Sequence, residues 1–165
     1  MEIKKNESTE LRPEGGRVMD APLVSMDIPE YINQLKSEAT WKNSDRNAMT
    51  VYKTNGMRIV LIALHQDAIM QKHTAEGIIS VQVLEGEILF STDDRSVVIR
   101  NGQMIALHKG LPHSVKAIKE SVFLLTPTTT LHVSNVIFNS AKPLFILFFV
   151  SSLISIAISS QFGPI

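Results

Sequence analysis

From residue 49 onward, apolar residues fall into short runs rich in Val, Ile and Leu. Turn-forming residues such as Asn55-Gly56, Asn101-Gly102 and Gly110 separate these runs. Short runs at this spacing, without helical patterns between them, predict an antiparallel all-β sandwich or barrel. The predicted strands cover residues 49–53, 57–64, 78–84, 87–91, 96–100, 103–107, 113–118 and 121–126.

A helical pattern precedes the strands. Asp27 is placed to cap a helix, Pro29 falls in the first turn, and Glu30 occupies the capping-box position. The helix is expected to run to about Ser37. Its apolar face, at helical spacing, consists of Ile28, Tyr31, Ile32 and Leu35.

The composition divides the chain into four parts. Residues 1–22 are polar, contain Gly15-Gly16 and two prolines, and are expected to form a disordered arm. Residues 23–127 carry the helix and the strands, and residues 128–142 read as a linker. Residues 143–165 form a hydrophobic tail.

Charge and cysteine content exclude several functions. Lys plus Arg and Asp plus Glu both number 16, so no basic surface for nucleic acid is expected. There is no cysteine, which removes disulfides, thiolate catalysis and zinc–thiolate sites. The polar N-terminus has no apolar core of a signal peptide, which favours a cytoplasmic domain.

The stretch NGQMIALHKGLPH resembles the second motif of the cupin superfamily, G-x5-P-x-G-x2-H-x3-N. Gly102, Gly110 and His113 match that motif. His108 stands where proline is usual, and Ala117 replaces the asparagine.

The stretch HTAEGIISVQVLEGE resembles the first motif, G-x5-H-x-H-x(3,4)-E-x6-G. Gly86 matches its end, and counting back places His73 at the first histidine. Asp67 stands at the opening glycine, Ala75 at the second histidine and Ile79 at the glutamate. The resemblance implies a small single-domain cupin, with an antiparallel jelly-roll barrel preceded by a short helix.

The departures bear on function. In the metal-binding members of the family that this chain resembles, three histidines and one glutamate hold iron, manganese, nickel or zinc. The resemblance implies that a metal would be held at the same positions here. Only His73 and His113 remain at those positions, and catalytic metal sites use about three protein ligands. A degenerate metal site with no cofactor is therefore expected, and a divalent transition metal on these two histidines is the alternative.

Three further residues are candidates for the pocket. His65 lies near the end of the preceding strand, and His108 lies across a turn from His113. Either could add a nitrogen ligand, although turn-adjacent histidines are usually solvated. Gln82 is also a candidate, but period-two counting points it away from the side of Ile79.

Two functions follow from these residues. The first is a non-catalytic barrel that binds a small molecule or acts as a sensor, in which Ala75 and Ile79 have removed the metal. The second is a metal-dependent enzyme, such as a dioxygenase or isomerase, that uses His73 and His113 with non-standard partners. The ligand is undetermined, no nucleic-acid partner is expected, and a homodimer is a candidate assembly.

The hydrophobic tail is a candidate membrane anchor. Residues 143–159 provide about 17 mostly apolar positions, the lower edge of what spans a bilayer as a helix. Lys142 would flank the membrane on the cytosolic side, whereas five serines between 151 and 160 weaken the signal. A helix packed on the barrel and an extension without a role are the competing interpretations.

Full-length protein is predicted to fractionate with membranes and to resist extraction by high salt. The reason is that an uncharged apolar segment of this length is not left exposed to water. Truncation after Thr126 serves as the control and should release a soluble domain with unchanged strand content. Monomeric full-length protein in the cytosolic fraction without detergent would contradict the anchor.

Overall fold

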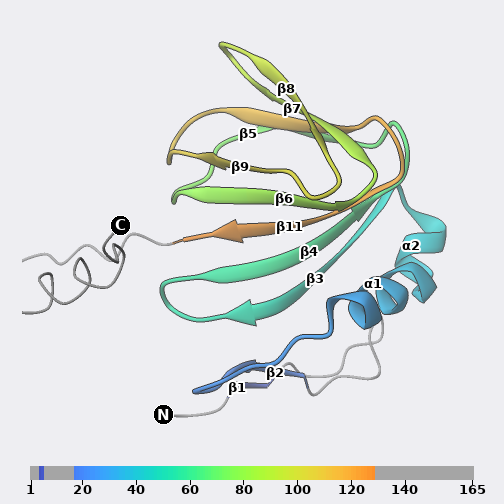
Figure 1. Ribbon diagram of the computed structural model, residues 1–165, viewed down its shortest axis with the longest axis vertical. Coiled ribbons are helices and arrows are strands. Elements are labelled where there is room, and N and C mark those ends of the chain that lie inside the picture. The colour runs from blue at the N-terminus through green and yellow to red at the C-terminus, as the bar shows by residue number, and fades with distance from the viewer. Residues whose placement is uncertain (1–3, 6–16, 129–165) are drawn as a thin grey trace, which may run out of the picture. The chain divides into compact units, whose positions relative to one another are not determined.

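The computed structural model describes residues 4–5 and 17–128 (Figure 1). Within these residues, no helix has the length and hydropathy needed to cross a membrane. Apart from Thr128, the linker lies outside the described residues, as does the hydrophobic tail with the anchor predicted at residues 143–159.

The described chain is mostly β-structure. Two helices, α1 (Ile28–Ser37) and α2 (Ala39–Asn43), follow the short strands β1 (Lys4–Lys5) and β2 (Val18–Asp20). Nine more strands complete the domain: β3 (Arg46–Lys53), β4 (Arg58–Leu64), β5 (Ile69–His73), β6 (Ile79–Glu85), β7 (Glu87–Thr92), β8 (Ser96–Arg100), β9 (Met104–Leu107), β10 (His113–Ala117) and β11 (Ser121–Pro127).

Two antiparallel sheets make up the body of the domain. One has five strands in the order β3-β4-β11-β6-β9, and the other has four in the order β5-β10-β7-β8. A core cluster with members from both sheets, including Ile62, Val81, Phe90 and Phe123, lies between them. These sheets confirm the predicted antiparallel all-β fold. The sheets pack together because inward-facing residues of their strands are buried in a shared core.

The helices cover the outer face of the five-stranded sheet (Figure 1). Ile32, Leu35 and Trp41 are buried against Met49, Val51, Leu61, Ala63 and Val122 of β3, β4 and β11. The predicted helix is confirmed and ends at Ser37, as expected. At its start, the side chain of Asp27 accepts a hydrogen bond from the backbone N–H of Glu30 at 3.0 Å, which is the predicted cap.

Most predicted strands lie within one to three residues of the observed bounds, but β5 and α2 were not predicted. The β5 sequence, Ile69–His73, is largely exposed and shows no alternation of apolar and polar residues. Pairing with β10 holds it in the sheet. Near the N-terminus, β2 pairs with β1 and lies beside β3, within the region that was expected to be a disordered arm.

Gly86 marks the corner where the chain leaves the five-stranded sheet for the four-stranded one. Its φ of 78° is positive, a conformation that glycine adopts more readily than other residues. A Cβ at this position would lie 2.1 Å from the carbonyl oxygen of Glu120 and 2.8 Å from Cα of Ser121. The glycine is therefore required both by conformation and by a close backbone approach.

Replacement Gly86→Ala should lower the free energy of unfolding by at least about 3 kcal/mol, because backbone strain and overpacking act together. Gly102→Ala is the matched control: its φ is 80°, but no atom lies within 4 Å of the added Cβ. It should cost only about 1 kcal/mol, the strain of the left-handed region. Urea unfolding measures both, and equal losses would show that the close approach at Gly86 is unimportant.

Lys36 connects α1 to the same corner. Its Nζ lies 2.8 Å from Oε2 of Glu85 and 2.9 Å from Oε1 of Glu120. Burial acts to lower the pKa of Lys36, but the two carboxylates outweigh it and raise the pKa above its ordinary value of 10.5. The charged form of the lysine is therefore favoured by folding.

Lys36→Met should reduce the free energy of unfolding by about 1 kcal/mol at neutral pH. Because the folded pKa is raised, this contribution is complete below 10.5 and disappears as the pH rises through the folded pKa. Urea unfolding of wild type and variant should therefore converge at high pH. Lys72→Met is the control, because its pairing with Asp93 is exposed, and it should change stability little at any pH.

Candidate functional site

His73 and His113 lie side by side on neighbouring strands of the four-stranded sheet. They are register partners between β5 and β10, and their ring centroids are 4.4 Å apart with an angle of 56° between the planes. His113 is buried and stacks on Phe90 at a centroid distance of 5.3 Å, whereas His73 is exposed. The two histidines matched to the motifs are thus brought together by strand register.

Backbone carbonyls fix the tautomers of both rings. Nδ1 of His73 donates to the carbonyl of Gln71 at 2.7 Å, and Nδ1 of His113 donates to the carbonyl of Leu111 at 2.9 Å. A carbonyl oxygen can only accept, so each Nδ1 carries the proton and each neutral ring has an acceptor at Nε2. Within the described residues, no hydrogen bond to either Nε2 is found.

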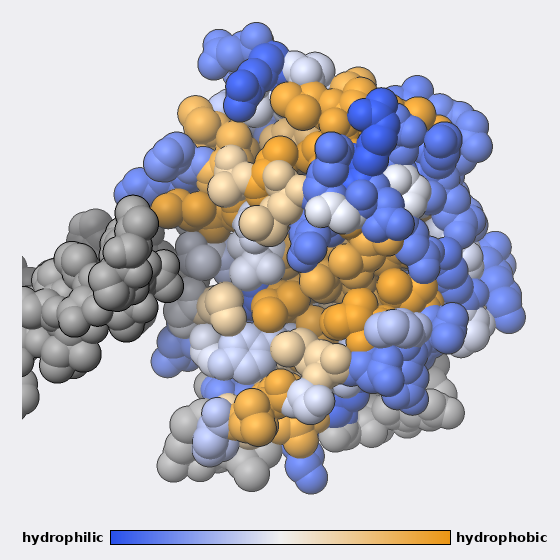
Figure 2. All heavy atoms as spheres, viewed as in Figure 1, coloured by the Kyte–Doolittle hydropathy of each residue, from blue (hydrophilic) through white to orange (hydrophobic). Residues whose placement is uncertain are grey.

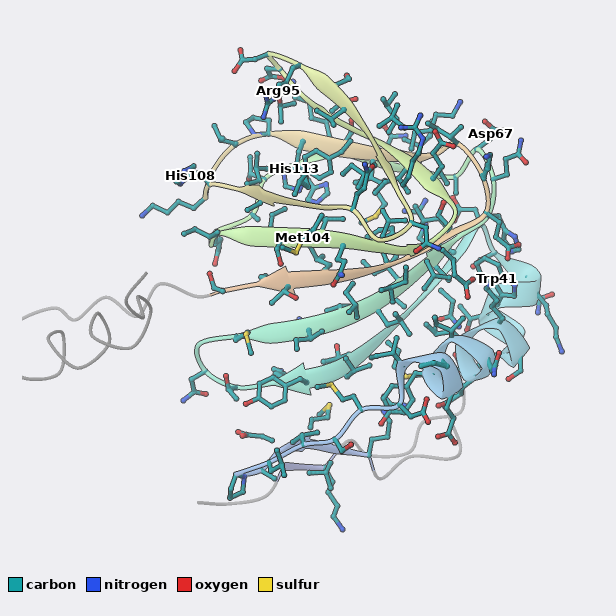
Figure 3. The ribbon with its side chains drawn as sticks, viewed as in Figure 1. Trp41, Asp67, Arg95, Met104, His108 and His113 are labelled. Carbon is teal, nitrogen blue, oxygen red and sulfur yellow. The ribbon has the colours of Figure 1, made fainter. Side chains whose placement is uncertain are left out.

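Both imidazoles line a cavity of about 370 Å³ at the end of the sandwich where β11 finishes. The remaining lining combines hydrocarbon groups with a few polar ones: Thr54, Met57, Arg58, Ala75, Glu76, Gly77, Ile79, Leu125, Pro127 and Thr128. Figure 3 shows His113 inside the sandwich, between the two sheets. The volume falls at the small end of the range for ligand pockets.

The residues of this cavity do not form a standard metal site. Ala75 and Ile79, which stand at the expected ligand positions, both line the cavity with hydrocarbon, and Ile79 is buried. Across residues 4–5 and 17–128, no group of three or more His, Cys, Asp or Glu side chains is placed to hold a metal ion. Two imidazoles are fewer than the three protein ligands that catalytic sites use.

Of the remaining candidates, His65 lies at the opposite end of the domain. Its ring stacks on Trp41 with centroids 3.6 Å apart, and its Nε2 lies 3.0 Å from the Trp41 carbonyl oxygen. Its Nδ1 is 3.7 Å from the Glu120 carboxylate. Figure 3 shows Trp41 beside the helices, away from His113. His65 therefore joins the helices to the sheet and does not line the cavity.

The other two candidates also lie outside the cavity lining. His108 is exposed at the start of the β9–β10 connection (Figure 3). Gln82 lies on the outer face of the five-stranded sheet opposite Met104, because its neighbours Val81 and Val83 occupy the inner core. The sequence argument that Gln82 points away from the side of Ile79 agrees with this arrangement.

Several lining residues were missed by the sequence analysis. Arg58 begins β4, and Glu76 lies in the connection after β5. A period-two count back from the buried Ile62 through Val60 would have pointed Arg58 inward. No comparable sequence signal identifies Glu76, because it lies outside the strands.

The backbone supports the alignment with the first motif. Asp67 stands at the opening glycine and has a positive φ of 66°, and among the described residues no other non-glycine residue shares this feature. The position therefore keeps the left-handed conformation that glycine favours, although its side chain differs.

The sequence matches no protein-family model and no curated protein. Solved structures do match. A cupin-2 domain-containing protein from Shewanella frigidimarina has a TM-score of 0.52 and 14% identity, over 63% of this chain and 94% of that one. A cupin superfamily protein from Desulfitobacterium hafniense has a TM-score of 0.50 and 14% identity, over 52% and 78%.

A conserved protein of unknown function from Streptococcus pyogenes has a TM-score of 0.50 and 21% identity, over 53% of this chain and 76% of that one. At such low identity the likeness concerns the fold. The two facing antiparallel sheets, the glycine positions of the motifs and these matches agree with one another. The chain has the fold of the cupin superfamily.

Proposed function

We propose that this domain binds a small organic molecule in the cavity between its sheets, as a sensor or accessory domain without its own metal chemistry. The observation that supports this proposal is the hydrogen bonding of the ring nitrogens of His73 and His113. Both rings have Nδ1 tied to the backbone, and neither Nε2 has a hydrogen-bond partner within the described residues. Such nitrogens accept hydrogen bonds from hydroxyl or amine groups of a ligand.

The hydrocarbon lining supports an organic ligand. Ile79 and Leu125 come from neighbouring strands of the five-stranded sheet, and Ala75 lies in the connection between β5 and β6. Apolar walls with a few directed polar groups are typical of small-molecule pockets. Ile79 also makes the cavity less favourable for a cation than a carboxylate would, because it offers no charge and displaces water.

The alternative is a metal-dependent enzyme of the dioxygenase or isomerase type. One observation favours it: metal-bound histidines usually donate their second ring N–H to a backbone carbonyl or a carboxylate, as His73 and His113 do here. The absence of a third ligand among the described residues counts against it. Measured metal content separates the two functions.

Full-length protein purified without chelator should carry well under one equivalent of transition metal. Replacing His73 or His113 by alanine should leave that content unchanged, because two imidazoles hold divalent ions weakly. His65→Ala is the control, since its ring stacks on Trp41 outside the cavity. A stoichiometric metal that is lost in both cavity variants and retained in His65→Ala would establish the enzyme alternative.

Ligand binding should be visible at the imidazoles themselves. In a titration of full-length protein with small hydroxylated aromatic compounds, saturable shifts are expected at the ring protons of His73 and His113 in nuclear magnetic resonance spectra. His113→Ala should weaken binding about tenfold, the effect of losing one hydrogen bond from a buried site. His65→Ala should bind as wild type does. Equal affinity in the two variants would argue against the cavity as the binding site.

A further inference from the structure

Arg58 lines the cavity, and a second cation, Lys53, lies beside it on the neighbouring strand. Lys53 ends β3 and Arg58 begins β4, and the two are direct register partners across the hairpin. The turn between them is fixed: Thr54 N–H donates to the Met57 carbonyl at 2.8 Å, and the Thr54 hydroxyl accepts from the N–H of Met57 at 3.1 Å. The two positive side chains therefore start from adjacent, rigidly held backbone positions.

Both side chains project to the inner face of the five-stranded sheet. Val60, Ile62 and Leu64 belong to the core between the sheets, and Arg58 has the same parity on β4. Arg58 lines the cavity, as this parity requires. Cross-strand partners share a face, so Lys53 lies on the same side as Arg58.

Within the described residues, neither cation has an ion-pair partner. Other cations of the domain do have a carboxylate within ion-pair distance: Lys36, Arg46, Lys72, Arg100, Lys116 and Lys119. Like charges placed directly opposite each other across two strands destabilise the pair. A bound anion would relieve this repulsion at the point where the cavity opens.

The facing wall provides a different chemistry. His73 and His113 come from the four-stranded sheet and present Nε2 acceptors, whereas Arg58 and Lys53 come from the five-stranded sheet. The apolar side chains of Met57, Ile79 and Leu125 also line the cavity. A ligand that satisfies both walls has a negative group at one end, a hydrogen-bond donor at the other and an apolar body.

We infer that the cavity takes a small hydroxylated organic carboxylate, whose carboxylate lies between Lys53 and Arg58 and whose hydroxyl donates to His73 or His113. This inference rests on the proposed function and specifies its ligand. The arginine guanidinium suits it, because its planar donors match the two oxygens of a carboxylate. Glu76 lines the same cavity, and its negative charge repels an anion, so it lowers the affinity for the carboxylate.

The test compares 3-hydroxybenzoate with 3-hydroxybenzamide, which share a skeleton and a hydroxyl and differ in charge. Full-length protein is titrated with each, and the ring protons of His73 and His113 report binding. The carboxylate should bind about tenfold more tightly than the amide, as a charge-assisted contact implies. Inorganic phosphate should bind more weakly than the carboxylate, because it lacks the apolar body.

Variants locate the anion. Arg58→Met and Lys53→Met should each weaken carboxylate binding about tenfold and affect the amide far less. Glu76→Gln should strengthen carboxylate binding, because it removes a like charge. Lys42→Met is the matched control: Lys42 is exposed on α2, outside the β3–β4 hairpin that carries Lys53 and Arg58. Unchanged urea midpoints would show that the Lys53 and Arg58 variants remain folded.

The outcomes separate the two proposals. If amide and carboxylate bind equally well, or if Arg58→Met binds the carboxylate as wild type does, the anion site is wrong and the cavity remains a binding site. If phosphate binds as tightly as the carboxylate, the site takes inorganic anions and the inference fails. If neither aromatic probe moves the histidine signals, the proposed function fails with it.

Discussion

The contact between Gly86 and the turn before β11 holds the two sheets together at one end. Here the chain passes from β6 of one sheet to β7 of the other, and the absence of a side chain lets Gly86 lie against the backbone of Glu120 and Ser121. The fully buried Ser121 hydroxyl accepts from the N–H of Glu87 at 2.9 Å and lies 2.7 Å from the Lys119 carbonyl. The Ser121 hydroxyl thus provides hydrogen-bond partners for backbone groups at this corner, where the chain passes between the sheets.

Charged residues around this corner attach the helices to the sheets. Lys36 of α1 reaches Glu85 and Glu120, on the two sides of the corner, while Glu87 pairs with Arg100 and Lys119. Trp41 and His65 pack in the same region. Stacking, ion pairs and backbone hydrogen bonds thus join the elements at this end of the domain. Apolar side chains also gather over the face of the domain that Figure 2 presents.

The opposite end of the same strands is where the cavity opens. Ile79 begins β6 and Pro127 ends β11, and both line the cavity, whereas Glu85 and Ser121 at their other ends form the corner. Building the rigid part at one end leaves side chains at the other end available to solvent and ligand. With hydrocarbon at Ala75 and Ile79, the charged and titratable side chains that line the cavity are two imidazoles, Arg58 and Glu76.

The sequence by itself determined the local features of the chain: the helix cap, a strand pattern and the turn positions. Asp27 caps α1 through its own turn, and alternation of apolar residues marks β6. The left-handed positions follow the glycines of the motifs, with Asp67 in place of one. The motif spacing also indicated that His73 and His113 belong together. These features depend on residues close in sequence, or on a spacing that the fold family shares.

Tertiary structure decided which of the other polar residues reach the cavity. His65 is eight residues from His73, yet β4 ends at the corner, and its ring packs on Trp41. Arg58 lies far from either histidine in sequence, but the order of strands brings the β3–β4 hairpin to the cavity. Strand β5 has no pattern of its own and exists because β10 pairs with it. Sequence spacing fixes which face of a strand a side chain occupies, but only the pairing of distant strands fixes what that face meets.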